Sequence, residues 1–240
     1  MEANSPLAGT AALITGASRG IGFAIAERLG QLGARIAICA RDAHVLEDAR
    51  ACLHSSGIDV FAAPADVSSG LQVSSLVEKA AARFGAIDFL VNNAGTSSFG
   101  PVHERSEQEW DTVLDTNLKG VFLTSRAVIP GMISRRRGHI VNISSLAGKN
   151  SFAGGSLYCA SKWGLLGLTY CMAEDLRAYG IRVTSICPGS VATDFGHPPS
   201  GKDRRKMLQP ADVAHVVEMV LTAEAQSFIS EVLLRPTQKP

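Results

Sequence analysis

The sequence predicts an α/β fold built on one doubly wound parallel sheet. Short apolar runs alternate with longer helical patterns along all 240 residues, and this alternation is typical of parallel strands joined by crossover helices. Most of the short runs are apolar nearly throughout, as expected when helices cover both faces of a sheet. We therefore expect seven strands, with helices on both faces, in a single domain spanning residues 1–240.

The expected strands are short, β-rich and far enough apart to leave room for a helix. They are residues 10–15, 35–40, 59–64, 87–92, 138–144, 181–187 and 228–234. Helical stretches lie between them, among them residues 21–32, 71–84, 118–134 and 157–179. No Pro/Gly-rich linker divides the chain. The one long irregular segment is Pro188 to Pro210, and we expect about residues 194–209 of it to form a substrate flap.

Composition excludes several function classes. Hydrophobic residues make up 46% and charged residues 19% of the chain, which is ordinary for a soluble globular protein with no membrane partner. A formal net charge of +1 gives no overall field for nucleic acid. The five cysteines have neither a Cys-x-x-Cys pair nor a metal-ligand spacing with histidine. With no signal-peptide core at the start, we expect a cytoplasmic protein with reduced thiols and no metal.

A glycine-rich turn follows the first expected strand. The stretch TGASRGIG, residues 15–22, has glycines at 16, 20 and 22 and leads directly into an apolar-periodic helix. Glycines in such a turn allow the backbone to approach a pyrophosphate and expose a helix N-terminus, whose dipole favours anions. A tight connection without a ligand is the alternative, and it leaves the grouping of three glycines unexplained.

Two cations indicate which dinucleotide binds at this turn. The second expected strand ends at Ala40 and Arg41, where an acidic residue would bind a ribose hydroxyl and an arginine accommodates a 2′-phosphate. Arg19 adds a positive charge inside the glycine turn. We therefore expect NADP(H) rather than NAD(H). The alternative is an ordinary surface arginine, which the neighbouring Asp42 could pair with.

The third and fourth expected strands also end in polar or small residues. The third ends in ADV, residues 65–67, and the fourth in NNAG, residues 92–95. Open α/β sheets bind ligands at the carboxyl ends of their strands. Asp66 offers an acceptor to an adenine amino group, Gly95 allows close backbone approach, and the two asparagines could tie neighbouring strands together. Turn formation is the alternative, because Asp, Asn and Gly are the commonest turn residues.

Candidate catalytic groups follow in the second half of the chain. Tyr158 and Lys162 stand one helical turn apart in YCASK, and a cation beside a phenol lowers the phenol pKa and suits it to acid–base work. A half-buried tyrosine beside a snorkelling lysine fits the spacing equally well. Ser144 or Ser145, after the fifth strand, offers a hydroxyl to a substrate carbonyl. The stretch DTNLKG places Asn117 at the start of a helix, where an N-cap is the simplest reading.

Taken together, these motifs resemble the short-chain dehydrogenase/reductase family, from about Thr10 to Leu234. The match rests on Thr15-Gly16-x-x-x-Gly20-x-Gly22, Asn92-Asn93-Ala94-Gly95, Asn117, Ser145, Tyr158-x-x-x-Lys162 and Pro188-Gly189, in the family's order and spacing. The resemblance implies a Rossmann-like domain. Within the family, the chain is similar to 3-oxoacyl-[acyl-carrier-protein] reductases.

The resemblance also implies a catalytic set of Asn117, Ser145, Tyr158 and Lys162. Tyr158 would protonate the carbonyl oxygen as hydride arrives from the nicotinamide, or remove that proton in the reverse direction. Ser145, rather than Ser144, would orient and polarise the carbonyl. Lys162 would lower the Tyr158 pKa and hold the ribose hydroxyls, and Asn117 would hold a water leading to Lys162.

The implied cofactor contacts combine the glycine turn, the strand ends, the catalytic helix and the start of the flap. They are Gly16, Ser18, Arg19, Gly20, Ile21, Gly22, Arg41, Asp66, Val67, Val91, Asn93, Ala94, Gly95, Tyr158, Lys162, Val191 and Thr193.

The sequence thus predicts an NADP(H)-dependent oxidoreductase acting on a ketone or secondary alcohol, with a 3-oxoacyl thioester or related carbonyl compound as substrate. The flap has few large apolar groups, which favours a flexible or acidic substrate over a bulky ring. The basic runs at residues 135–137 and 202–206 offer a docking surface for a carrier-bound acyl chain, and solvated faces are the alternative.

Two other functions remain open at this stage. A broad-specificity carbonyl reductase or alcohol dehydrogenase is the alternative within the family, and a non-catalytic NADP(H)-binding regulator is the alternative outside it. The helices at residues 118–134 and 157–179 have apolar residues on more than one face, which indicates a homodimer or homotetramer.

Overall fold

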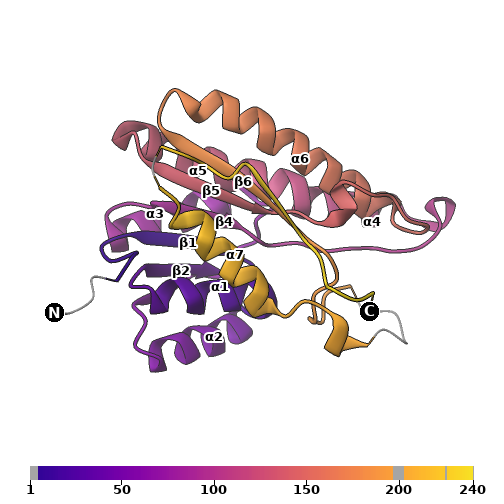
Figure 1. Cartoon of the computed structure of the whole chain (residues 1–240), viewed down its shortest axis with the longest axis horizontal. Helices are drawn as coiled ribbons and strands as arrows, with labels where there is room; N and C mark the ends of the chain where they lie inside the picture. The colour runs from indigo at the N-terminus through magenta and orange to yellow at the C-terminus, as the bar shows by residue number, and fades with distance from the viewer. Residues whose placement is uncertain (1–4, 197–202, 225, 240) are drawn as a thin grey trace.

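The computed structural model describes residues 5–196, 203–224 and 226–239. Seven parallel strands form one sheet in the order β3-β2-β1-β4-β5-β6-β7 (Figure 1). The strands are β1 (Ala11–Thr15), β2 (Arg35–Cys39), β3 (Val60–Ala62), β4 (Phe89–Asn92), β5 (Gly138–Ile143), β6 (Ile181–Pro188) and β7 (Glu231–Leu234). This arrangement confirms the predicted α/β fold with its doubly wound parallel sheet.

Helices cover both faces of the sheet. They are α1 (Gly20–Gln31), α2 (Ala43–Ser55), α3 (Gly70–Phe84), α4 (Glu107–Leu114), α5 (Gly120–Arg135), α6 (Ser156–Arg177) and α7 (Pro210–Leu221). In Figure 1, α6 runs along the top of the view and α2 along the bottom, with the sheet between them.

The sheet divides the core into two layers. On β1, Ala12 and Ile14 pack with α1, α2 and α7, whereas Ala11 and Leu13 pack with α3, α5 and α6. Successive strand residues point to opposite faces, so a strand covered on both sides must be apolar at every position. The unbroken apolar runs in the sequence have this cause.

The expectation that Asn117 begins a helix is wrong. Helix α4, a π-helical turn (Asp115–Lys119) and α5 follow one another without a break, so Asn117 lies inside a continuous helical segment. A capping box of Ser106 and Glu109 starts this segment at Glu107. At the π-helical turn, the Gly120 N–H reaches back to the carbonyl of Asp115, and such turns occur frequently at functional sites.

Two strands are three residues shorter than predicted. β3 covers only Val60–Ala62, at the sheet edge where β2 is its one neighbour, and β7 begins at Glu231. The segment expected to be irregular, Pro188 to Pro210, is in part regular. β6 extends through Pro188, and Val191 forms a parallel bridge with Leu208. Residues 197–202 of the expected flap lie outside the described residues.

The first basic run lies at the edge of the sheet where the strands begin. Arg135 donates to Ile87 O at 2.7 Å, Arg136 donates to Ala178 O at 2.8 Å, and Arg137 lies 3.7 Å from Asp88. These contacts bind the end of α5 to its neighbours.

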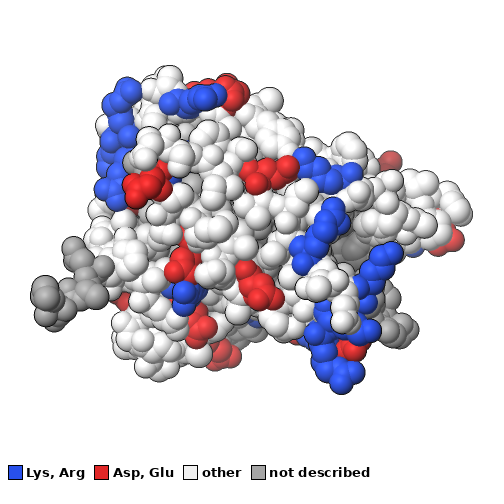
Figure 2. Space-filling view, viewed as in Figure 1, with Lys and Arg blue, Asp and Glu red and all other residues white. Residues whose placement is uncertain are grey.

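The second basic run lies elsewhere and is paired within its own segment. Arg204 pairs with Asp194 and Arg205 with Asp203, while Lys202 lies outside the described residues. Figure 2 shows Lys and Arg gathered at separate places on this face, one of them over the segment between β6 and α7.

The described residues contain neither a membrane-spanning helix nor a cluster of metal ligands. No helix in them is both long and apolar enough to cross a membrane. They also contain no group of three or more His, Cys, Asp or Glu side chains arranged to hold a metal ion.

His139 is a buried, neutral histidine in β5. Its Nε2 lies 2.8 Å from Thr184 Oγ1, which donates its own proton to Ile229 O at 2.6 Å. Nε2 therefore carries the proton of a neutral ring, and Nδ1 has no hydrogen-bond partner among the described residues. Burial, aided by the nearby charge of Arg182, lowers the His139 pKa from 6.5 to about 3.

We expect His139 to make the protein sensitive to acid. The unfolded chain takes up a proton at this residue near pH 6.5, whereas the folded ring stays neutral to about pH 3. Stability from the neutral ring is therefore complete above pH 6.5 and is lost as the pH falls toward 3, at about 1.4 kcal/mol per pH unit. Urea unfolding at about pH 7.5 and about pH 5 should show a loss about 2 kcal/mol larger in the wild type than in His139→Gln. Identical losses in the two proteins would contradict the neutral buried ring.

Candidate active site

One cleft of about 1590 Å³ runs along the edge of the sheet where the strands end. The predicted site residues that line it are Gly16, Ser18, Arg19, Gly20, Ile21, Arg41, Asp66, Val67, Asn93, Ala94, Gly95, Ser145, Tyr158, Lys162, Val191 and Thr193. Gly22, Val91 and Asn117 do not line the cleft and are buried instead. The structure therefore brings nearly all of the predicted residues to one place.

The turn between β1 and α1 packs directly against the residues that follow β4. Gly16 has a φ of 65°, and a Cβ built there would lie 2.7 Å from Ala94 Cα. A Cβ at Gly22 would lie 2.5 Å from Gly16 O. Arg19, the N-cap of α1, makes no side-chain capping bond, and the residues beginning the helix line the cleft. Glycine thus permits the close approach, and the free N–H groups of α1 suit an anion.

Thr15 and Asn93 hold this turn in place. Thr15 Oγ1 accepts hydrogen bonds from Asn93 N at 3.0 Å and Ala94 N at 3.1 Å. Asn93 Nδ2 donates back to the carbonyls of Thr15 and Gly16, each at 3.0 Å. Asn92, one residue earlier, donates to Asn142 Oδ1 on β5 at 2.8 Å. The asparagines therefore tie neighbouring strands together, as the sequence predicts.

Arg19 and Arg41 are both exposed and both line the cleft near the glycine turn. The carboxylate of Asp42 is engaged elsewhere, because Oδ1 accepts from His44 N at 2.9 Å and Val45 N at 3.1 Å and thereby caps α2. Asp42 thus acts as an N-cap, and both guanidinium groups lie at the cleft wall.

Asp66 is both a turn residue and a residue of the cleft wall, the two alternatives that the sequence left open. Its Oδ1 accepts from Ser68 N at 2.9 Å and Ser68 Oγ at 2.8 Å, which is the chemistry of a turn. Asp66 and Val67 nevertheless line the cleft at the end of β3.

The chemical end of the cleft combines residues that follow β5 with one face of α6. Tyr158 and Ser145 both line this end of the cleft, and the Ser145 side chain is close enough to affect the Tyr158 pKa. One turn further along α6, Lys162 is buried and donates from Nζ to Ile143 O at 2.9 Å. Its Nζ lies 5.8 Å from the centroid of the Tyr158 ring. The four-residue spacing therefore does place the phenol and the ammonium on one face.

The expected lowering of the Tyr158 pKa is wrong for this structure. Burial raises the Tyr158 pKa to about 12, although the Ser145 side chain opposes the rise. Burial also lowers the Lys162 pKa to about 8. The ammonium of Lys162 is directed to a backbone carbonyl rather than to the phenol, so desolvation of the phenolate is the larger effect. Tyr158 is consequently a protonated acid at neutral pH.

Asn117 is buried between the loop after β4 and α6. Its Nδ2 donates to Thr96 O at 2.8 Å and Ser161 Oγ at 3.0 Å, and its Oδ1 accepts from Thr96 N at 2.8 Å. Both amide protons are thus used in fixing the loop after β4 against α6. The amide protons of Asn117 are therefore not available to a water leading to Lys162, which leaves its backbone carbonyl or the second lone pair of Oδ1 to hold one.

Three aromatic residues at the cleft were missed by the sequence reasoning. Phe99, Phe152 and Phe195 line the cleft, and the rings of Phe99 and Phe195 lie 5.7 and 5.8 Å from the ring of Tyr158. The sequence reasoning considered the apolar groups of the flap alone, whereas Phe99 and Phe152 come from loops outside the flap. The signal was present as single phenylalanines in small, polar stretches, SSFG and NSFAG.

The chain belongs to the short-chain dehydrogenase/reductase family. The family model described as short chain dehydrogenase matches residues 10–203. This match confirms the resemblance carried by the glycine turn, the NNAG stretch and the Tyr158–Lys162 pair, and with it the predicted class of enzyme.

Individual relatives support the same family. A 3-oxoacyl-[acyl-carrier-protein] reductase of Staphylococcus epidermidis is 36% identical over 91% of this chain and 90% of its own length. Glycine betaine reductase ATRR of Emericella nidulans is 34% identical over 98% of this chain, which spans only 19% of that protein. Among solved structures, a metagenomic short-chain oxidoreductase in complex with NADP is 44% identical, with a TM-score of 0.87 over 98% of this chain and 100% of that chain.

We expect Gly22→Ala to destabilise the protein, because the new Cβ would meet Gly16 O and Ala17 Cα within 3 Å. Overpacking against backbone costs about 1–3 kcal/mol, which would lower the Tm by roughly 2–12 °C at this chain length. Thermal unfolding measures the effect. Gly167→Ala on α6 is the control, because its Cβ would meet nothing within 4 Å and alanine favours the helix by about 1 kcal/mol. Equal Tm values for the two variants would contradict the close approach at Gly22.

Proposed function

We propose that this protein is an NADP(H)-dependent oxidoreductase that interconverts ketones and secondary alcohols. The observation that carries the proposal is the continuity of one cleft. It joins a glycine turn built for a pyrophosphate to Tyr158, with Ser145 beside Tyr158 and Lys162 buried one helical turn away. A regulator that only binds nucleotide has no need of that acid and its partners.

The residues fit a nicotinamide dinucleotide on structural grounds. Gly16 and Gly22 leave no room for a Cβ, the N-terminus of α1 lacks a side-chain cap, and Asp66 and Val67 lie at the adenine end predicted from the sequence. When bound, the nicotinamide supplies or accepts the hydride. Val191 and Thr193, at the start of the flap, would meet its amide end.

We assign the acid–base chemistry to Tyr158. With its pKa near 12 the phenol is protonated at neutral pH, so in reduction it is able to donate its proton to the carbonyl oxygen. The Ser145 hydroxyl, at the same end of the cleft, would orient that oxygen. Lys162, whose pKa is about 8, would stabilise the phenolate that remains and hold the ribose hydroxyls. Asn117 would position this group through Ser161 and Thr96.

Arg19 and Arg41 support NADP(H) over NAD(H). Both line the cleft, and Asp42, the nearest competing carboxylate in sequence, caps α2 instead. The related metagenomic oxidoreductase was solved with NADP, which supports the same cofactor here.

The substrate class is proposed at the level of a ketone or secondary alcohol. The name of the Staphylococcus relative supports a 3-oxoacyl thioester. The predicted carrier-docking surface has no such support, because residues 135–137 lie at the far edge of the sheet and Arg204 and Arg205 pair with carboxylates of their own segment. The three phenylalanines at the cleft favour a relaxed or aromatic carbonyl substrate instead.

We also propose a homo-oligomer in a reducing compartment such as the cytoplasm. Phe122 on α5 and Trp163 and Tyr170 on α6 are 44%, 55% and 40% exposed, which is unusual for large rings on covering helices and suits contact between copies. Five free thiols, three of them buried, suit a reducing environment. Light scattering after size exclusion tests the assembly.

Tyr158→Phe should abolish most of the activity while leaving nucleotide binding intact. The substitution removes the proton donor and keeps the ring, so kcat for ketone reduction should fall by about 10²- to 10⁴-fold. NADPH oxidation measures turnover, and NADPH fluorescence on titration measures binding. Tyr179→Phe, at the exposed end of α6, is the control and should match the wild type. Turnover that survives in Tyr158→Phe would remove the assigned acid.

Arg41→Ala should weaken the preference for the phosphorylated cofactor. Loss of a charged hydrogen bond costs about 1.5–3 kcal/mol, so the ratio of kcat/KM with NADPH to that with NADH should fall by about 10- to 100-fold. Arg177→Ala, at the end of α6, removes an exposed arginine away from the cleft and should leave the ratio unchanged. An unchanged ratio in Arg41→Ala would assign the discrimination to other residues.

A further inference from the structure

Three phenylalanines surround the candidate acid and are only partly covered. Phe99 lies in the loop after β4, Phe152 in the loop before α6 and Phe195 after β6, and they are 42%, 49% and 43% exposed. We call these three side chains the aromatic wall. Their rings form a chain with Tyr158: Phe152 to Phe99 at 5.9 Å, Phe99 to Tyr158 at 5.7 Å, and Tyr158 to Phe195 at 5.8 Å.

The exposed surface of the wall belongs to the cleft. All three phenylalanines line it together with Tyr158 and Ser145. The ring spacings fall in the range of edge-to-face and offset aromatic pairs, and the Phe99–Tyr158 pair is edge-on at 74°. A further aromatic ring entering the cleft would therefore find ring faces and edges already arranged for it.

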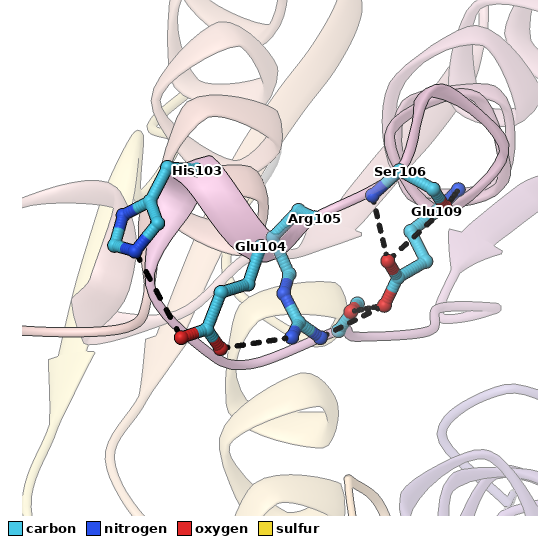
Figure 3. Close-up of polar contacts among 6 residues, drawn as sticks. His103, Glu104, Arg105, Ser106 and Glu109 are labelled. Atoms are coloured by element: carbon cyan, nitrogen blue, oxygen red, sulfur yellow. Dashed lines mark hydrogen bonds and ion pairs between the residues drawn. The ribbon is translucent and has the colours of Figure 1, made fainter.

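Glu109 fixes the position of the loop that carries Phe99. Figure 3 shows its carboxylate between the guanidinium of Arg105 and the backbone N–H of Ser106. Ser98, next to Phe99, donates to Glu109 Oε1 at 2.6 Å, and Arg105 donates to the same oxygen at 3.0 Å. Ser106 N donates to Oε2 at 2.8 Å. The Ser106 N–H and the Ser98 hydroxyl lower the Glu109 pKa to about 2, so the carboxylate stays charged.

Gly100 fixes the backbone that follows Phe99, as Ser98 fixes the backbone that precedes it. Its φ is 148°, and a Cβ there would lie 2.8 Å from Arg105 Cζ. Its N–H donates to Gly154 O at 2.9 Å, which joins the Phe99 loop to the Phe152 loop. Phe99 is thus held between two anchored neighbours, and the first two rings of the wall keep their relative position.

The start of the flap supplies the third residue of the aromatic wall, Phe195. Phe195 N donates to Thr193 Oγ1 at 3.3 Å. A Cβ at Gly196 would lie 2.9 Å from Phe99 Cε2 and 2.8 Å from Ser97 Oγ. Glycine at residue 196 therefore lets the flap pass directly over Phe99 and bring Phe195 to the opposite side of Tyr158.

We propose that the aromatic wall makes this cleft an aryl-ketone site, with Glu109 as the residue that positions Phe99. The inference rests on the proposed function. The aromatic ring of the substrate lies among the three phenylalanines, and its carbonyl oxygen meets Tyr158 and Ser145. Hydride from the reduced nicotinamide forms the new C–H bond, the C=O π bond breaks, and the Tyr158 proton goes to the oxygen. The products are a secondary alcohol and the oxidised nicotinamide, and a solvent proton restores the phenol.

Acetophenone and cyclohexyl methyl ketone test the proposal, because they share a carbon skeleton and differ in the aromaticity of the ring. With NADPH, the wild type should show a kcat/KM at least about 10-fold higher for acetophenone, which is about 1.4 kcal/mol. Phe99→Leu keeps an apolar side chain and should reduce this ratio to near one. Phe228→Leu is the matched control and should preserve the ratio, because Phe228 lies in the segment that leads into β7.

Glu109→Gln tests the positioning role. We expect the KM for acetophenone to rise several-fold with kcat nearly unchanged, and the KM for cyclohexyl methyl ketone to stay the same. A general loss of structure would instead change both ketones alike. Glu104→Gln is the control, because Glu104 also contacts Arg105 but makes no bond to the Phe99 loop (Figure 3).

Failure of the aryl-ketone site and failure of the proposed function give different results. If the wild type turns over cyclohexyl methyl ketone or an acetoacetyl thioester as well as acetophenone, or if Phe99→Leu leaves the ratio unchanged, the aryl-ketone site is overturned. If no ketone is turned over, the proposed function fails, and saturation-transfer NMR with NADP⁺ present decides the wall separately. Preferential binding of acetophenone, lost in Phe99→Leu, would support the wall, and equal binding of the two ketones would overturn it.

Discussion

The contact between the β1–α1 turn and the end of β4 is the constraint on which the rest of the site depends. Gly16 allows the two backbones to touch. Asn93 holds them together with three hydrogen bonds to the turn, and Ala94 N donates a fourth to Thr15 Oγ1. The chain then runs from Asn93 through Thr96, which Asn117 fixes against α6, and on to Phe99. One short segment therefore sets the distance between the nucleotide end and the substrate end of the cleft.

Burial explains why the acid and the cation belong together. Desolvation favours the neutral forms of both Tyr158 and Lys162, raising the pKa of one and lowering that of the other. Each charge is costly by itself, and the attraction between a phenolate and an ammonium formed next to each other would offset part of that cost. The Lys162 ammonium donates a hydrogen bond to the backbone carbonyl of Ile143 at the end of β5. The site thus favours a charged pair over either charge alone.

The sequence predicts those features that local patterns determine. Apolar runs gave the sheet, because both of its faces are covered, and the glycine turn and the YCASK stretch gave the two ends of the cleft. Asn117 was misplaced because a capping box at Ser106 starts the helical segment earlier. The predicted lowering of the Tyr158 pKa was wrong because the spacing of two residues carries no information on their burial. Phe99 was missed because its neighbours in the cleft are far away in the chain.

Catalysis and selection are assigned to different parts of the fold. Tyr158 and Lys162 stand on a long helix packed against the sheet, whereas Phe99 stands on a loop that a single carboxylate, Glu109, ties to the start of α4. Residues on regular elements keep the reacting atoms in place, and loops on such a scaffold vary at low cost to stability. Because Glu109 contacts the loop and not the acid, a change there alters which ring fits while the proton donor stays in position. The same acid and sheet can therefore serve different carbonyl substrates through changes to this cluster alone.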